Sequence, residues 1–162
     1  MYFDYCPTIF DIDYNKYKNL KVVLLDIDNT LAPFKDYEIN DKIKDYLNNL
    51  KNLGYDVLIY SNASTRRIQY FAKEYGIRYF TRACKPFSTE IKHFLKNNRY
   101  KPDEVLLIGD QLFTDVFCAN RYKIHVAWVE PLSKKEDLFT TFKRVLEYPK
   151  KKKARQNYNK EG

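Results

Sequence analysis

Glycine is scarce in this chain of 162 residues: it has four glycines, and none of them forms a G-x-x-x-x-G-K or a G-x-G-x-x-G pattern. Those patterns build the backbone loops that hold nucleotide phosphates, so their absence argues against mononucleotide and dinucleotide binding. No apolar run approaches the roughly 20 residues that a membrane-spanning helix needs. The N-terminus also lacks the basic stretch and apolar stretch that are typical of a secretory signal. We therefore expect a cytoplasmic protein.

Cysteine and histidine are equally sparse. The three cysteines, Cys6, Cys84 and Cys118, are scattered and include no C-x-x-C pair. Their odd number and spacing predict free thiols in a reducing compartment and argue against a zinc site. No histidine stands near Cys84 in a pattern that would activate a catalytic thiol. The two histidines, His93 and His125, fall in a predicted helix and a predicted strand, and we expect both to be structural.

Short apolar segments alternate with helical patterns across residues 21–148. The apolar segments predict strands at 22–25, 55–60, 77–80, 104–108 and 124–129. Apolar residues at helical spacing predict helices at 41–53, 64–75, from 88 onward, at 114–121 and at 135–147. Strands that alternate with helices of this length predict a three-layer α/β fold with a central parallel five-stranded sheet.

The two ends of the chain differ from this central domain. Residues 1–20 are aromatic and irregular, and we expect them to form an N-terminal arm packed on residues 21–148. Residues 149–162 contain six basic side chains and one acid, so they carry +5 of the net charge of +8. This composition predicts a disordered tail. A basic tail favours an anionic membrane surface or a nucleic acid as its partner, whereas the ordinary interpretation is a solvated run of charge.

The pattern Asp26-x-Asp28-x-Thr30 follows the first predicted strand directly. A turn is the ordinary interpretation, because Asp and Asn bond readily to their own backbone. Two carboxylates directly after a buried strand nevertheless need a compensating partner, because buried unpaired charge is costly. The strand and the two aspartates together therefore indicate a site rather than a simple turn.

The carboxyl ends of parallel strands meet at one edge of the sheet, where ligands bind in folds of this class. The polar residues that follow three of the strands converge there: Asp26 and Asp28, Ser61 and Asn62, and Asp110 with Asp115. Four carboxylates in one crevice require a divalent cation or shifted pKa values. Oxygen ligands without histidine favour Mg²⁺. Lys85, which precedes Pro86 at a helix start, is either a solvated lysine or a cation of this site.

These residues resemble the four motifs of the haloacid dehalogenase (HAD) superfamily, in the order and spacing of its phosphatases. The motifs are Asp26-x-Asp28-x-Thr30, Ser61, Lys85 and Gly109-Asp110-x-x-x-x-Asp115. Further segments resemble the YqeG-like branch of subfamily IIIA, which is related to phosphatidylglycerophosphatases: DNTL, SNAS with Arg66-Arg67, ACKPF, GDQLFTDV with Asn120-Arg121, and KKEDLFTTFKR. The resemblance covers residues 7–148 and implies a Rossmann-like HAD fold.

The resemblance also implies a Mg²⁺-dependent phosphatase that forms an aspartyl-phosphate. Asp26 would be the nucleophile, and Asp28 would protonate the leaving oxygen and then activate water. Ser61 and the backbone N–H of Asn62 would bind phosphate oxygens, and Lys85 would neutralise them.

The metal ligands implied by the resemblance are Asp26, Asp110 and the backbone carbonyl of Asp28. Asp115 would hold a metal-bound water, and Thr30 would brace the loop.

Members of this superfamily with specificity caps insert a module after the first motif or between the second and third. Here each interval holds a single predicted helix and little more, which predicts a capless, open site. An open site suits a phosphate on a large or membrane-embedded substrate. The leading substrate hypothesis is phosphatidylglycerophosphate at the inner face of the membrane, with the basic tail in peripheral contact with anionic lipid.

Two other functions remain open from the sequence. One is a phosphatase that acts on nucleic-acid ends or a phosphoprotein. The other is a non-enzymatic RNA- or ribosome-associated module that binds through its tail, although the chain carries every position of the catalytic pattern. A receiver domain is disfavoured, because it lacks the second aspartate of the first motif.

Overall fold

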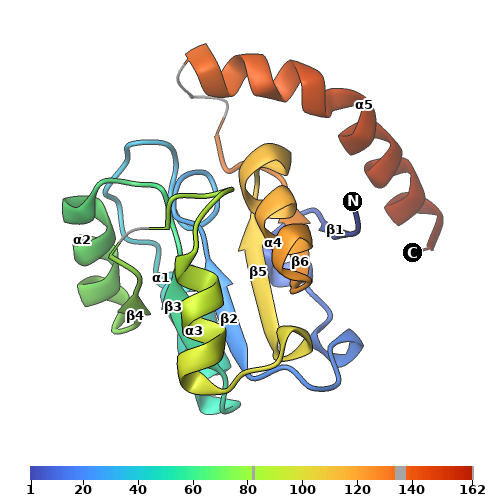
Figure 1. Ribbon diagram of the computed structural model, residues 1–162. Coiled ribbons are helices and arrows are strands. Elements are labelled where there is room, and N and C mark those ends of the chain that lie inside the picture. The colour runs from blue at the N-terminus through green and yellow to red at the C-terminus, as the bar shows by residue number, and fades with distance from the viewer. Residues whose placement is uncertain (82, 134–137, 162) are drawn as a thin grey trace.

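A parallel six-stranded sheet forms the centre of the fold, in the order β1-β6-β5-β2-β3-β4 (Figure 1). The computed structural model describes residues 1–81, 83–133 and 138–161, and in the last segment it describes the side chains of 144–160. The strands are β1 (Asp4–Cys6), β2 (Val22–Leu25), β3 (Asp56–Ile59), β4 (Arg78–Tyr79), β5 (Val105–Gly109) and β6 (His125–Val129). The helices are α1 (Asp41–Asn52), α2 (Thr65–Tyr75), α3 (Glu90–Asn98), α4 (Phe117–Tyr122) and α5 (Leu138–Glu161).

The predicted three-layer architecture is confirmed, and β2 shows how the sequence builds it. All four residues of β2 are buried, and alternate side chains point to opposite faces of the sheet. Val23 and Leu25 pack in one buried cluster with residues of α1 and α2. Val22 and Leu24 pack in a second cluster with residues of α3 and α4, which lie in front of the sheet in Figure 1. A strand covered by helices on both faces is therefore apolar at every position.

The N-terminal arm adds a sixth strand, which corrects the prediction of five. Asp4–Cys6 forms β1 and pairs in parallel with β6, with Asp4 opposite Ala127. Phe3 meets Trp128 edge to face with ring centroids 5.0 Å apart. Because β1 has only three residues, its sequence carries no periodic pattern, and its pairing depends on the exposed edge that β6 offers.

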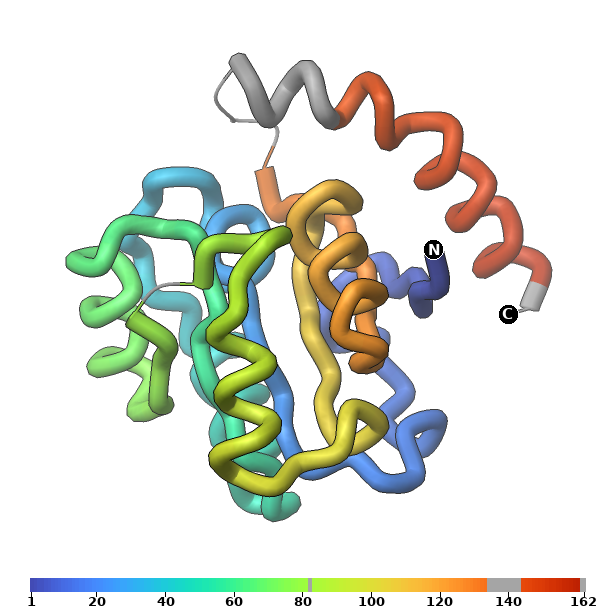
Figure 2. Tube along the Cα trace, in the orientation of Figure 1, coloured from blue at the N-terminus to red at the C-terminus, as the bar shows by residue number. Residues whose placement is uncertain are grey.

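Residues 149–161 are helical, which corrects the prediction of a disordered tail. They form the second half of α5, which continues through Pro149. Lys151 and Ala154 are buried, and Arg155 pairs with Glu130 at 2.6 Å. Figure 2 shows the last turns of α5 beside the N-terminal segment, where Tyr5 and Tyr158 meet with ring centroids 5.8 Å apart. Tertiary contacts therefore order a segment whose composition alone favours solvent. Of the helix predicted at 135–147, residues 135–137 lie outside the described residues.

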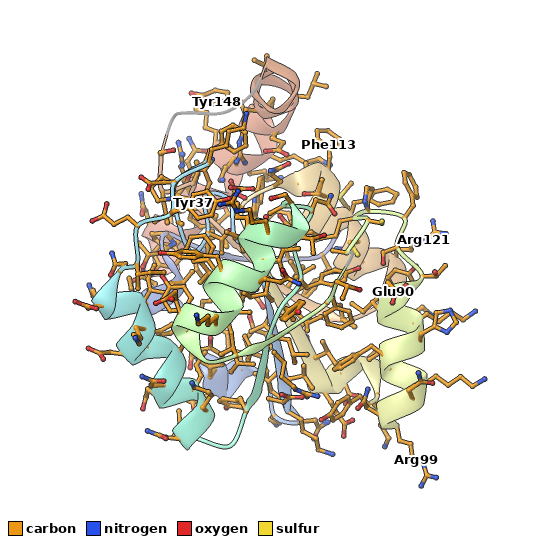
Figure 3. All side chains as sticks on the ribbon, turned by 90° about the vertical axis from the view of Figure 1, so that its left-hand side faces the viewer. Tyr37, Glu90, Arg99, Phe113, Arg121 and Tyr148 are labelled. Atoms are coloured by element: carbon orange, nitrogen blue, oxygen red, sulfur yellow. The ribbon has the colours of Figure 1, made fainter. Side chains whose placement is uncertain are left out.

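The arch of α5 passes over the end of the sheet at which the strands have their carboxyl ends (Figure 1). Figure 3 shows Tyr148 of α5 and Phe113 near that end of the molecule, and Arg99, at the end of α3, near the opposite end. Among the described residues, no helix has the length and apolar character needed to cross a membrane.

Candidate active site

Three buried aspartates meet at the carboxyl edge of the sheet. β2 and β5 are neighbours with Leu25 opposite Ile108, and the Asp26 backbone N–H donates to the Ile108 carbonyl at 3.0 Å. This register places Asp26 beside the loop that follows β5. One carboxylate oxygen from each of Asp26, Asp110 and Asp115 lies within 4.8 Å of the other two.

Gly109 permits this close approach. A Cβ atom at position 109 would lie 2.2 Å from Cγ of Asp115, well inside contact distance. Asp115 can therefore fold back over the end of β5 only because position 109 has no side chain. A turn of π-helix, Leu112–Val116, carries Asp115 into place, and the Gln111 backbone N–H donates to its Oδ2 at 3.1 Å.

Lys85 bridges two of these aspartates, so the solvated interpretation is wrong. Its Nζ lies 3.0 Å from Oδ1 of Asp26 and 2.5 Å from Oδ1 of Asp115, and its side chain is 1% exposed. Burial disfavours the charged ammonium, but the carboxylates of Asp115 and Asp26 outweigh burial and raise the pKa of Lys85. The lysine is therefore a fixed positive charge between the two carboxylates.

The carboxyl groups of Asp110 and Asp115 are held in a setting that disfavours their charge. Burial raises the pKa of both groups, and neighbouring carboxylates add to the shift. Arg144 opposes it at Asp110, and Lys85 opposes it at Asp115. Oδ1 of Asp110 is buried and has no hydrogen-bond partner among the described residues. Buried carboxylate oxygens without histidine or thiolate ligands fit a hard divalent cation such as Mg²⁺.

Asp28 lies beside this cluster, and its carboxylate pairs with the guanidinium group of Arg67. Its Oδ1 is 3.0 Å from Nη2 of Arg67 and accepts a hydrogen bond from the Lys35 backbone N–H at 3.3 Å. Burial raises the pKa of Asp28; Arg67 opposes the shift and Asp26 adds to it. The side chain of Asp28 is 21% exposed, so this carboxyl group, unlike the buried three, reaches solvent.

The loop after β3 is tied to the loop that carries Lys85. The Asn62 side chain donates to the Lys85 carbonyl at 2.9 Å and accepts from the Lys85 backbone N–H at 2.8 Å. Ser61 is buried, and its Oγ accepts from the Ala63 backbone N–H at 3.2 Å. A hollow of about 360 Å³ is lined by Ser61, Asn62 and Lys85, among other residues. A phosphate-sized group therefore has room beside these three residues.

Thr30 lies in the turn that follows Asp28. Its backbone N–H donates to the Ile27 carbonyl at 3.1 Å. Its hydroxyl is buried and has no hydrogen-bond partner among the described residues. In this structure Thr30 supports the loop through its backbone bond.

Sequence reasoning missed two arginines. Arg67 is buried and also donates to the carbonyl groups of Pro33 and Asp36, which follow the first motif. Arg144 of α5 forms an ion pair with the carboxylate of Asp110. The Arg66-Arg67 pair in the matched SNAS segment was the available signal for Arg67. Arg144 is the last residue of the KKEDLFTTFKR segment, but nothing in that segment indicated that its partner is Asp110, 34 residues away.

Comparisons with known proteins identify a family and relatives for this chain. A family model described as mitochondrial PGP phosphatase matches residues 3–132. The chain is 31% identical over 146 residues to the probable phosphatase YqeG of Bacillus subtilis, covering 89% of this chain and 85% of that protein. It is 27% identical over 164 residues to mitochondrial phosphatidylglycerophosphatase GEP4 of Saccharomyces cerevisiae, covering 84% of this chain and 85% of that protein.

The fold is similar to that of 3-deoxy-D-manno-octulosonate 8-phosphate phosphatase from Moraxella catarrhalis, solved with magnesium, phosphate and KDO. The TM-score is 0.52 at 23% identity, over 61% of this chain and 62% of that one. A HAD family hydrolase from Streptomyces avermitilis gives a TM-score of 0.56 at 18% identity, over 68% of this chain and 72% of that one. The fold, the four motif loops and the relatives define a phosphatase of the HAD superfamily. Within that superfamily, the chain belongs to the PGP phosphatase family and is YqeG-like.

Proposed function

We propose that this protein hydrolyses a phosphomonoester with Mg²⁺ through an aspartyl-phosphate on Asp26. The observation that carries the proposal is the buried cluster of Asp26, Asp110 and Asp115 at the carboxyl edge of the sheet, with Lys85 between Asp26 and Asp115. A nucleophilic carboxylate needs its charge compensated while an anionic phosphate approaches. Lys85 and a bound cation together supply that compensation.

The reaction has two steps on the residues of this chain. A carboxylate oxygen of Asp26 attacks phosphorus as the bond to the leaving oxygen breaks, and Asp28 donates the proton that this oxygen needs. Asp28 then takes a proton from the water that attacks phosphorus, which releases phosphate and restores Asp26. The raised pKa of Asp28 suits a group that must first give a proton and then take one. Ser61 and the Asn62 backbone N–H would bind phosphate oxygens, and Lys85 would neutralise them.

The residues that would hold Mg²⁺ are Asp26, Asp110 and the backbone carbonyl of Asp28. The buried Oδ1 of Asp110, which has no hydrogen-bond partner among the described residues, supports this assignment. Asp115 pairs with Lys85 and would orient a water of the metal. When bound, the ion would neutralise phosphate oxygens and offset the repulsion among the carboxylates.

Phosphatidylglycerophosphate is the substrate that we propose. The family description and the yeast relative name this activity. The outer side of α5 supports a membrane-bound substrate: Val145, Leu146 and Tyr148 are 67%, 55% and 58% exposed, and the exposed lysines Lys150, Lys152 and Lys153 follow them. Exposed apolar side chains next to lysines fit the surface of an anionic bilayer. The proposed location is therefore the cytoplasmic face of a membrane, in peripheral contact.

Phosphate release from two substrates tests this function. Purified protein is given p-nitrophenyl phosphate in solution or phosphatidylglycerophosphate in vesicles, with Mg²⁺ or with a chelator. We expect hydrolysis of both, preference for the lipid and loss of activity on chelation. Asp26→Asn should remove turnover, whereas Asp45→Asn, an exposed aspartate of α1, should not. Substantial turnover by the Asp26→Asn protein would refute the nucleophile, and indifference to the lipid would refute the substrate.

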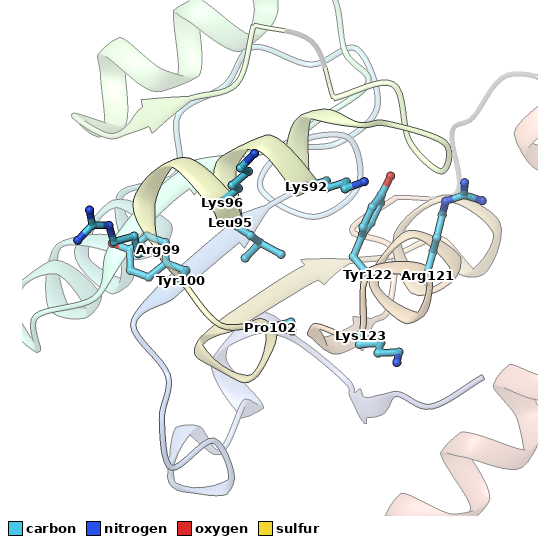
Figure 4. Close-up of a pocket in the computed structure, with 9 residues that line it drawn as sticks. All are labelled: Lys92, Leu95, Lys96, Arg99, Tyr100, Pro102, Arg121, Tyr122 and Lys123. Carbon is cyan, nitrogen blue, oxygen red and sulfur yellow. The ribbon is translucent and has the colours of Figure 1, made fainter.

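A second candidate, a phosphatase for nucleic-acid ends, is favoured by one surface feature. A hollow of about 520 Å³ lies between α3 and α4 (Figure 4). No acid is among the described residues that line it, and five basic side chains are: Lys92, Lys96, Arg99, Arg121 and Lys123. Such a surface attracts a phosphodiester backbone. Faster hydrolysis of an end-phosphorylated oligonucleotide than of the lipid, lost in a Lys96→Glu, Arg99→Glu double variant, would place this candidate first.

A further inference from the structure

Helix α5 reaches the catalytic edge from outside the segment matched by the family model, which ends at residue 132. Arg144 makes two contacts with Asp110. Its Nη2 pairs with the carboxylate Oδ2, and its Nη1 donates to the Asp110 backbone carbonyl at 2.5 Å. The Arg144 side chain is 17% exposed and that of Asp110 is fully buried. This two-point contact fixes both the backbone and the carboxylate of one residue.

Glu147, one turn further along α5, completes the attachment. Its Oε1 accepts hydrogen bonds from the backbone N–H groups of Leu112 at 2.8 Å and Phe113 at 3.4 Å. Its Oε2 accepts from Nη1 of Arg144 at 3.1 Å. The glutamate is buried, with a side chain 1% exposed. Arg144 and Glu147 together hold the loop on both sides of Gln111.

Two further side chains, Trp128 of β6 and Lys151 of α5, contact the backbone carbonyl group of Asp110. Nε1 of Trp128 donates to the Asp110 carbonyl at 2.8 Å, and Nζ of Lys151 approaches it at 3.4 Å. Lys151 also donates to the Val129 carbonyl at 3.0 Å and lies 4.8 Å from the centroid of the Trp128 ring. Asp110 is thus the point at which α5, β6 and the catalytic loop join.

We propose that Arg144 is a positioning residue for the metal site. This inference rests on the proposed function, because it assigns a role toward the metal that the function requires. Arg144 engages Oδ2 of Asp110 and leaves Oδ1, the buried oxygen without a hydrogen-bond partner among the described residues, as the ligand for the cation. An arginine that fixes a ligating carboxylate in this way orients the ligand and raises metal affinity. The support of the metal site therefore extends beyond residues 3–132, which the family model matches, into α5.

The opposite arrangement is that Arg144 competes with the cation for Asp110. The two arrangements predict changes of opposite sign in Mg²⁺ affinity when Arg144 is removed. Metal-stripped wild type, Arg144→Met and Arg144→Lys are titrated with Mg²⁺ by calorimetry and by fluorescence of Trp128, the only tryptophan in the chain. Arg155→Met is the matched control, because Arg155 also anchors α5 but pairs with the carboxylate of Glu130 and not with that of Asp110.

We expect the Kd for Mg²⁺ to rise about 10- to 100-fold in Arg144→Met, as is typical when the support of a metal ligand is lost. Arg144→Lys should recover part of the Mg²⁺ affinity, because lysine restores the positive charge but lacks the planar guanidinium group that makes two contacts at once. With a soluble phosphoester, the Mg²⁺ concentration that gives half-maximal turnover should rise by the same factor as the Kd. At saturating Mg²⁺, the kcat of Arg144→Met should be close to that of wild type. A purely structural role would reduce the folded fraction without moving that midpoint.

Unchanged or tighter Mg²⁺ binding in a folded Arg144→Met protein would overturn the inference. If Arg144→Met does not fold, the Kd of Arg144→Lys for Mg²⁺ serves as the test, and a value no higher than that of wild type would overturn the inference. An Arg155→Met protein that loses as much affinity would overturn it as well, because anchoring of α5 would then suffice as the explanation. Wild type that binds no Mg²⁺ would instead remove the proposed function together with this inference, so the two failures are distinct.

Discussion

Replacement of Lys85 by methionine tests the charge arrangement of the site through protein stability. The ammonium group lies between Asp26 and Asp115, and the three side chains are 1%, 7% and 0% exposed. Removing one partner of a buried ion pair leaves uncompensated charge and costs about 3–5 kcal/mol. We expect the free energy of unfolding without Mg²⁺, measured by urea denaturation near neutral pH, to fall by about that amount.

The pH dependence of this loss separates charge from packing. Burial already raises the pKa of Asp115 while Lys85 opposes the shift, so removal of Lys85 raises that pKa further. A carboxyl group with a raised pKa binds more protons in the folded state than in the unfolded state, so folding is favoured as pH falls. We therefore expect Lys85→Met to lose more free energy of unfolding at about pH 8 than at about pH 5.5. The difference should be about 1.4 kcal/mol per pH unit for each extra proton that the folded state binds.

Lys73→Met, at an exposed position of α2, is the matched control and should change stability little. A loss of less than about 1 kcal/mol for Lys85→Met would be in the range of an exposed pair and would refute the buried bridge. An equal loss at both pH values would assign the effect to packing and not to the two carboxylates.

Three other outcomes follow from described contacts. Asp28→Asn should lose about 10²–10⁴-fold in turnover of alkyl phosphates and less with aryl phosphates, whose leaving groups need little protonation; equal losses would contradict the acid role. Burial would raise the pKa of Glu130, but hydrogen bonds from Arg155 and Tyr5 outweigh burial and lower this pKa to about 2. The ionised Glu130 therefore stabilises the folded protein above the ordinary pKa of a glutamate, and this stabilisation is lost as pH falls toward 2. Wild type should therefore lose stability over that window in acid titrations followed by Trp128 fluorescence, and Glu130→Gln should lose less; parallel curves would count against the ion pair. The third outcome concerns three exposed lysines of α5: Lys150, Lys152 and Lys153. Replacing them by glutamine should weaken binding to anionic vesicles by about 1 kcal/mol per charge without changing turnover of a soluble phosphoester. Unchanged vesicle binding would refute the membrane contact.

The confirmed parts of the fold depend on local patterns. Val22–Leu25 is apolar at every position, which is the pattern of a strand covered on both faces, and the structure buries all four residues. Helix limits were also readable: the Ser64 side chain caps α2, and Gly76 ends it with a left-handed φ of 60°. Each of these features involves residues close in sequence, so one stretch of chain carries the whole signal.

Local sequence patterns did not predict several contacts of the site. Asn62 was expected to act through its backbone N–H, yet its side chain also ties two loops through Lys85. Asp28 was expected to offer its backbone carbonyl to the metal and its carboxyl group to the leaving oxygen, and the pairing of that carboxyl group with Arg67 was not predicted. Which polar groups meet at short range depends on side-chain packing, which a motif spacing does not specify.

The sequence by itself determined that Asp26, Ser61 and Asp110 share one edge of the molecule. Parallel strands joined by helices have all their carboxyl ends on the same side, so the order of strands and helices was sufficient. Only the tertiary structure decided that α5 reaches back to Asp110 and that residues 149–161 are helical. A basic segment is helical here because Lys151 and Arg155 find carbonyl and carboxylate partners on β6 and just after it. Those partners exist only once the sheet has formed.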